Sequence, residues 1–186
     1  LPDFRAGERT FQILVQVAGR CGRGDIPGEV IVQTYSPSNY AVIHASRHDY
    51  RGFYEAELSS RRELEYPPFS HIISVIATSH DESRAVAALG EIASRLSGGG
   101  ISPPIMADGL PRADAGQAAG GSMKLLGPSP LAMRRAKGEY RWHILIKARD
   151  IGLAAHLVRE AALEVSKEAM RTGVRIMVDI DPQDMV

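Results

Sequence analysis

The chain has 186 residues, a formal net charge of zero and a composition that is 44% apolar and 24% charged. This length fits one large domain or two small ones, and it excludes a complete two-lobed nucleotide motor. No apolar stretch approaches the ~20 residues of a membrane span, which excludes an integral membrane protein. The single cysteine, Cys21, excludes an internal disulfide and a cysteine-built zinc site, and it indicates a reducing, cytoplasmic compartment.

The start of the chain and its charge distribution are also informative. The chain begins at Leu1 without a targeting segment, and we therefore expect a fragment of a longer protein. Residues 123–150 hold 7 Lys and Arg against 2 Asp and Glu, so this stretch is basic in a neutral chain. A local excess of this size can supply phosphate contacts, although a solvated basic face explains it equally well.

The first 66 residues are predicted to form two helices around one strand. Residues 8–23 place Phe11, Leu14 and Ala18 within one arc of a helical wheel. The β-branched residues 30–32 predict a buried strand, and a charged helical pattern covers residues 40–65. The prolines at 67 and 68 end that helix, and we place a domain boundary at this double proline.

The rest of the chain is predicted to combine strands and helices. Strands are expected at residues 71–78, 123–126, 140–148 and 174–180. Ser79 to Glu82 have the spacing of a capping box for a first helix, and Asp150 is the expected N-cap of a second. Residues 97–122, with 7 Gly and 3 Pro, predict a flexible insertion. The order strand, helix, strand, strand, helix, strand is the ferredoxin-like arrangement, so the predicted fold class is α+β.

The segment Q-V-A-G-R-C-G-R at residues 16–23 carries the clearest chemical pattern. At ~100° per residue, Gln16, Arg20 and Arg23 lie within about a 60° arc of a helix. Guanidiniums are permanently charged and match phosphate oxygens in pairs, as arginine fingers do at a transferring γ-phosphate. Small residues such as Gly19 leave space for the close approach of a ligand. A surface helix with two solvated arginines would have the same spacing.

Several motifs together resemble one helicase family. Q-x-x-G-R-x-G-R is similar to the sixth motif of the superfamily 2 helicases. Further motifs along the chain resemble primosomal protein N′, the PriA family of bacterial replication-restart helicases. They are L-P-D-F-R-A from residue 1, R-E-L from residue 62, Y-P-P-F from residue 66, L-G-P from residue 126, Y-R-W from residue 140 and V-D-I-D-P from residue 178. The resemblance covers nearly the whole chain except residues 97–122.

The resemblance implies part of an ATP-dependent DNA helicase that moves 3′ to 5′, recognises stalled replication forks and initiates primosome assembly. Arg20 and Arg23 would act as catalytic arginines at the ATP site, which Gln16 and Gly19 would line. The implied domains are the end of helicase lobe 2 at residues 1–45, a connecting helix at 46–66 and a DNA-binding C-terminal domain at 67–186.

The resemblance also implies cofactors and partners. ATP and Mg²⁺ would be bound mainly by a lobe outside this chain, which has no G-x-x-x-x-G-K-[ST] phosphate loop, so the chain alone is not expected to hydrolyse ATP. The family holds zinc in a cysteine-rich insertion that precedes this segment, and we expect no metal in this chain. The implied partners are forked and single-stranded DNA, the acidic tail of single-strand-binding protein and other primosome proteins, but no membrane.

Basic residues around the predicted strand at 140–148 are candidates for DNA contact, because basic side chains on a strand face can follow a sugar-phosphate backbone. The candidates are Lys124, Arg134, Arg135, Lys137, Arg141 and Lys147. The three between 134 and 137 are expected in a mobile loop around Gly138, or in a solvated turn. Trp142 is in phase with Ile144 and Ile146, which predicts a core position, whereas His143 is expected on a solvent-exposed face.

Weaker patterns leave alternatives open. His44 and His48 have the i, i+4 spacing of a metal site, but no third ligand is in phase nearby. Asp179 and Asp181 share one strand face, where we favour pairing or solvation over a cation site. The chain also fits a stand-alone nucleic-acid-binding or protein-interaction module without catalysis. Arginine substitutions that change ATP turnover would distinguish a motor component from such a module.

Overall fold

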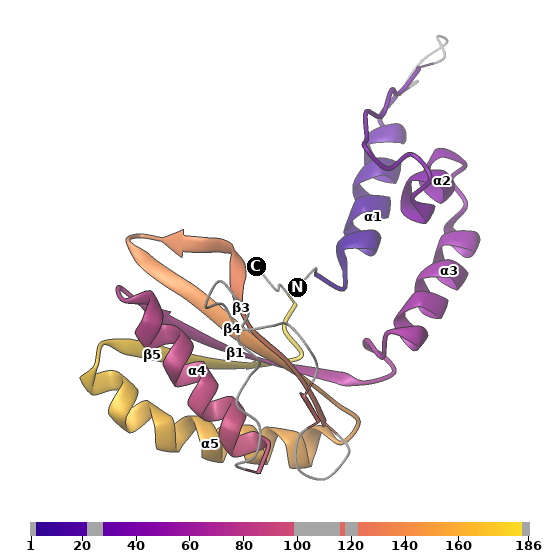
Figure 1. Ribbon diagram of the computed structural model, residues 1–186. Helices are drawn as coiled ribbons and strands as arrows, with labels where there is room; N and C mark the ends of the chain where they lie inside the picture. The colour runs from indigo at the N-terminus through magenta and orange to yellow at the C-terminus, as the bar shows by residue number, and fades with distance from the viewer. Residues whose placement is uncertain (1–2, 22–27, 99–115, 118–122, 184–186) are drawn as a thin grey trace. The chain divides into compact units, whose positions relative to one another are not determined.

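The computed structural model describes residues 3–21, 28–98, 116–117 and 123–183 (Figure 1). They form two compact units, divided between Leu64 and Glu65. The first unit is helical, and the second combines a sheet with two helices, so the predicted α+β class is confirmed. Among the described residues, no helix is both long enough and apolar enough to span a membrane.

The first unit consists of α1 (Ala6–Ala18), α2 (Tyr40–Ser46) and α3 (Tyr50–Glu63). Phe11 of α1 stacks on Phe53 of α3 with ring centroids 4.2 Å apart, and alanines of α2 complete a small core. The single helix predicted over residues 40–65 is wrong, because the chain turns between α2 and α3. Asp49 accepts a hydrogen bond from the Gly52 N–H at 2.9 Å and thereby caps α3 as a new helix.

The strand predicted at residues 30–32 is not formed. These residues have no strand partner within the described part of the chain, and Ile31 is 86% exposed. A strand needs a neighbour for its backbone hydrogen bonds, and the β-branched pattern alone cannot provide one. Val30 and Val32 instead line a cavity of about 600 Å³ together with Leu14 and Ala18 of α1.

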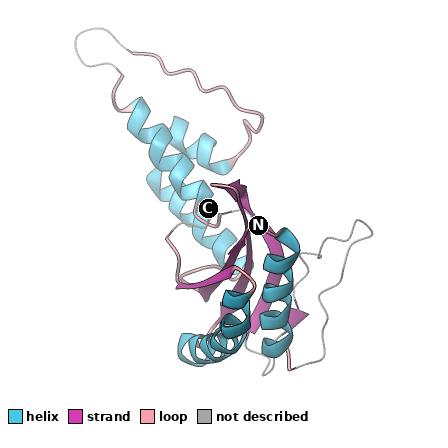
Figure 2. Cartoon of the chain, turned by 90° about the vertical axis from the view of Figure 1, so that its left-hand side faces the viewer, coloured by secondary structure: helices cyan, strands magenta, loops and turns pink. Residues whose placement is uncertain are grey.

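The second unit is an antiparallel sheet with the strand order β2-β3-β4-β1-β5. The strands are β1 (His71–Ser79), β2 (Gly116–Gln117), β3 (Met123–Ala136), β4 (Glu139–Ala148) and β5 (Val174–Ile180). Helices α4 (Glu82–Leu96) and α5 (Ile151–Arg171) cover one face of the sheet (Figure 2). The insertion predicted at residues 97–122 falls mostly outside the described residues.

The core of the second unit lies between the sheet and these two helices. Trp142, Ile144 and Ile146 of β4 point toward the helices, and each is at most 1% exposed. Leu89 of α4 and Val158 of α5 are completely buried in the same cluster. The predicted core position of Trp142 is therefore confirmed.

Element boundaries differ from the prediction where local signals compete. Asp81, rather than Ser79, caps α4, and its carboxylate accepts hydrogen bonds from two backbone N–H groups. Asp150 caps α5, as predicted. β3 continues to Ala136 instead of ending near residue 126, because pairing with β4 extends past the prolines. Two shifts in the strand register accommodate these prolines.

Candidate functional site

The helix predicted over residues 8–23 is wrong at its C-terminal end, because α1 ends at Ala18. Arg20 therefore lies beyond the helix, and the predicted helical face shared with Gln16 is not formed. Gln16 is exposed on the last turns of the helix, and Gly19 is its C-cap. Arg20 follows in a tight turn, where its N–H donates to the Val17 carbonyl at 3.1 Å. Arg20 is exposed, and its guanidinium has no acidic partner in the part of the chain that the structure describes. Arg23 lies outside the described residues.

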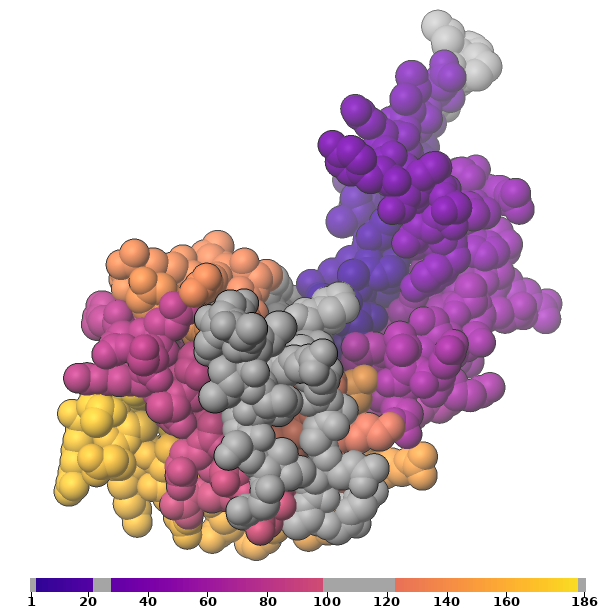
Figure 3. Space-filling model, viewed as in Figure 1, coloured from indigo at the N-terminus to yellow at the C-terminus, as the bar shows by residue number. Residues whose placement is uncertain are grey.

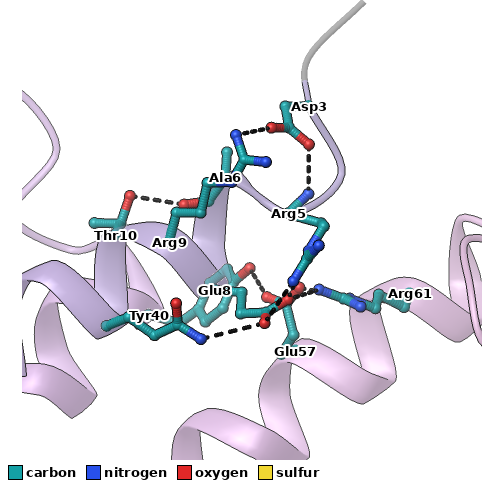
Figure 4. A network of polar contacts seen from close by, with 10 residues as sticks. Asp3, Arg5, Ala6, Glu8, Arg9, Thr10, Tyr40, Glu57 and Arg61 are labelled. Atoms are coloured by element: carbon teal, nitrogen blue, oxygen red, sulfur yellow. Dashed lines mark hydrogen bonds and ion pairs between the residues drawn. The ribbon is translucent and has the colours of Figure 1, made fainter. Parts of the chain in front are cut away.

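The opposite end of α1 is held by a polar cluster that the sequence pattern did not predict (Figure 4). Glu57 of α3 is only 8% exposed, and it accepts hydrogen bonds from the Tyr40 hydroxyl at 2.6 Å and from Arg61 Nε at 2.7 Å. Arg61 also donates to Glu8 of α1 at 3.1 Å. Each of the three helices therefore contributes to this cluster, which we call the Glu57 cluster: Glu8, Tyr40, Glu57 and Arg61.

The electrostatics of the Glu57 cluster are those of a partly buried ion-pair network. Hydrogen bonding from Arg5 lowers the pKa of Glu8 below its usual value. Burial, followed by the hydrogen bond to Glu57, raises the pKa of Tyr40 to about 12. Glu8 is therefore ionised and Tyr40 remains a hydrogen-bond donor throughout the physiological range. No motif signals such a cluster, because its members come from three separate helices.

Three of the basic candidates lie on the sheet face opposite α4 and α5. Lys124 of β3 is directly opposite Lys147 of β4, and Arg141 lies on the same face of β4. Lys124 pairs with Glu65, and hydrogen bonding from Lys124 lowers the pKa of that carboxyl group. The Lys147 ammonium lies 3.6 Å from the centre of the Tyr66 ring, and burial lowers its pKa.

The other three basic candidates lie at the tip of the β3–β4 hairpin, which agrees with the predicted turn and not with its alternative, a mobile loop. Arg134 and Arg135 belong to β3, and a tight turn at Lys137 and Gly138, both with positive φ, joins it to β4. The tip lies at the surface beside α4 (Figure 3). Arg134 donates two hydrogen bonds of 2.8 Å to Glu82 at the start of α4.

Most of the basic candidates therefore have a partner within the chain. Glu82 also accepts a hydrogen bond from Trp142 Nε1 at 2.8 Å, which fixes the hairpin against α4. The Arg135 guanidinium lies 5.1 Å from the centre of the Tyr140 ring. Within the described residues, no polar partner is found for the side chains of Lys137 and Arg141. Among the six basic candidates, these two are the most available to an external anion.

The weaker candidates have structural roles. His44 Nδ1 lies 3.0 Å from the carboxylate of Asp49, the residue that caps α3. Asp181 bonds to the ring of His71 at 2.9 Å and accepts from the Ile72 N–H at 3.1 Å, so it closes the end of the sheet. Within the described residues, no group of three or more His, Cys, Asp or Glu side chains could hold a metal ion.

His143 differs from the prediction of a solvent-exposed position. It lies on the same sheet face as Arg141, as alternation requires, but it is only 2% exposed. Alternation determines which face a side chain occupies, but it cannot determine what covers that face. The predicted sheet face of His143 is therefore confirmed, whereas its predicted solvent exposure is wrong.

These features define an α+β protein with two units. In the helical unit the exposed Arg20 follows the end of α1, and in the second unit an antiparallel sheet presents basic side chains on the face without helices. Residues 62–183 match the family described as primosomal protein N C-terminal domain. The chain belongs to this family.

Curated relatives extend the similarity to the whole chain. Replication restart protein PriA of Bacillus subtilis (strain 168) is 34% identical over 187 residues, which covers 100% of this chain and 21% of that protein. The protein of the same name from Treponema pallidum is 32% identical over 185 residues, covering 100% of this chain and 25% of the relative. The Synechocystis protein is 31% identical over 183 residues. The chain thus spans about a fifth of the length of these relatives.

Proposed function

We propose that this chain is the C-terminal part of an ATP-dependent 3′ to 5′ DNA helicase that recognises stalled replication forks and initiates primosome assembly. The family match and the relatives named replication restart protein PriA support this proposal. In this proposal ATP and Mg²⁺ are bound mainly by the preceding four-fifths of the protein. Its partners are forked and single-stranded DNA, the acidic tail of single-strand-binding protein and other primosome proteins, in the cytoplasm.

The observation that carries the ATP part of the proposal is the accessibility of Arg20. A guanidinium that approaches a transferring phosphate must be exposed and must not be neutralised by a neighbouring carboxylate. Arg20 meets both conditions within the described residues. In this proposal Arg20 and Arg23 place positive charge on the phosphate oxygens, and Gln16 and Gly19, at the C-terminal end of α1, contact the nucleotide.

The proposal is tested by ATP turnover of the full-length protein carrying Arg20→Ala or Arg23→Ala. A positively charged contact made mainly in the transition state predicts a loss of about 10³-fold or more in kcat, with DNA affinity nearly unchanged. Unchanged turnover in both variants would contradict a motor function. It would favour the alternative, a binding module without catalysis.

The proposed domains are those that the resemblance implies, although helices α1, α2 and α3 pack together in one compact unit. Residues 1–45 are assigned to the end of helicase lobe 2 and residues 46–66 to a connecting helix. Residues 67–186 are assigned to a C-terminal DNA-binding domain. Support for a ferredoxin-like fold of this last domain comes from the strand order β3-β4-β1-β5 and from two helices on one face of the sheet.

DNA binding is assigned to the basic side chains of the second unit. Arg141 and Lys137, which have no described partner, are assigned the strongest phosphate contacts. Lys124, Lys147, Arg134 and Arg135 contribute when DNA competes with their partners within the chain. Side chains from a strand face and a hairpin tip can together follow a phosphate backbone, and such contacts make affinity depend on salt.

We expect the double variant Arg141→Ala and Lys137→Ala to bind DNA more weakly and to have a shallower salt dependence. Each phosphate contact that is lost should reduce the slope of log affinity against log salt by about one. Arg171→Ala at the end of α5 is the matched control, because Arg171 is exposed, pairs with Glu168 of the same helix and is not one of the candidates, so its slope should change little. An unaltered slope in the double variant would exclude these two side chains as phosphate contacts.

A further inference from the structure

The Glu57 cluster lies where the start of α1 contacts both of the other helices. Gly7 of α1 has no side chain at this contact, and a Cβ there would meet the Tyr40 hydroxyl and lie 2.8 Å from Glu57 Oε2. One turn further along α1, Phe11 stacks on Phe53. The N-terminal half of α1 is therefore packed against both neighbouring helices.

The C-terminal half of α1 has much less support within the described residues. Ile13 is 60% exposed and Val17 is 47% exposed, while Leu14 and Ala18 border the cavity of about 600 Å³. Leu14 and Val15 pack against the small core of the first unit, so the orientation of this half depends on those contacts as well as on the contacts at the opposite end of the helix.

A small tilt of α1 at the cluster produces a larger displacement at the far end of the helix. Gly7 and Ala18, the last residue of α1, are eleven positions apart, and a helix rises ~1.5 Å per residue, so the end of α1 lies ~17 Å from the contact, with Arg20 two residues beyond it. A tilt of about 5° at Gly7 would move the end of α1 by about 1.5 Å, and a displacement of ~1 Å can cost about 100-fold in rate.

We propose that the Glu57 cluster positions Arg20 for ATP hydrolysis, with Glu57 as the central positioning residue. The buried carboxylate holds Tyr40 of α2 and Arg61 of α3 at fixed distances, and Arg61 carries the restraint to Glu8 of α1. Removal of one partner from a buried ion pair leaves the other charge buried and uncompensated, which costs more free energy than the same change at the surface. The helix packing is therefore sensitive to a substitution within the cluster. This inference rests on the proposed function, since it needs Arg20 to act on ATP.

The test is a double-mutant cycle on kcat for ATP in the full-length protein. Glu57→Gln keeps the shape of the side chain and removes its charge. We expect it to lower kcat by about 10-fold or more while KM for ATP changes by less than about 3-fold, as expected for a displaced transition-state contact. Glu55→Gln on the same helix is the matched control, because Glu55 is exposed and its one ion pair in the described part of the chain is with Arg51, and it should leave kcat unchanged.

The cycle separates positioning from a purely structural role. If Glu57 acts through Arg20, the double variant Glu57→Gln with Arg20→Ala should have the same kcat as Arg20→Ala alone. Multiplicative losses, or normal kcat in Glu57→Gln, would overturn the positioning role while the proposed function stands. If Arg20→Ala itself leaves kcat unchanged, the proposed function and the positioning role both fail. If Glu57→Gln does not fold, Tyr40→Phe replaces it in the cycle, with the same expected outcomes.

Discussion

His143 is the buried side chain of the sheet whose polar atoms are least satisfied. Neither ring nitrogen has a hydrogen-bond partner within the described residues. Burial lowers the pKa of this imidazole to about 4. The unfolded chain takes up this proton as the pH falls through about 6.5, whereas the folded chain keeps the ring neutral until about pH 4. The stability that His143 contributes is therefore fully present above pH 6.5 and decreases toward pH 4.

We expect His143 alone to reduce the free energy of unfolding by about 2 kcal/mol between pH 7 and pH 5. Urea unfolding at the two pH values, with His143→Leu as the comparison, measures this contribution. The variant should lose about 2 kcal/mol less over this interval, because leucine does not titrate. Equal losses in both proteins would mean that the imidazole is not held neutral by burial.

The helices and strands with a clear period were predictable from the sequence. Alternation located β4 and β5, and the 3.6-residue period located α4 and α5 with their inward residues. The Glu57 cluster was not predictable, because Tyr40, Glu57 and Arg61 acquire their roles only when α2 and α3 pack on α1. The same reason explains β3, whose continuation past Pro128 and Pro130 depends on pairing with β4.

Residues 28–34 form no strand with any other described segment of this chain. If this segment is a strand of helicase lobe 2, the strands beside it belong to the preceding part of the protein. We expect the backbone amides of residues 29–34 to exchange rapidly in this chain and at least about 100-fold more slowly in the full-length protein. Hydrogen exchange measures both directly. Equally rapid exchange in the full-length protein would contradict a strand at this position.

The two units differ in how completely their cores are formed by residues of this chain. Residues 65–183 contain a sheet, two helices and a continuous core, so their fold is explained by their own sequence. The first unit exposes Ile13, Val17 and Ile31. Under the proposed function these side chains pack against the preceding part of the protein, which would also hold the ATP site near Arg20.

We propose above all that Arg20 contacts the ATP of a helicase, and that the paired N–H donors of its guanidinium are needed for this contact. This contact is tested most directly by the steady-state kcat of the full-length protein with Arg20→Lys, which keeps the positive charge but removes the paired donors. The proposal predicts a fall of about 100-fold or more in DNA-stimulated kcat, with a normal thermal unfolding midpoint and normal DNA affinity. A lysine variant that hydrolyses ATP at the unaltered rate would contradict it.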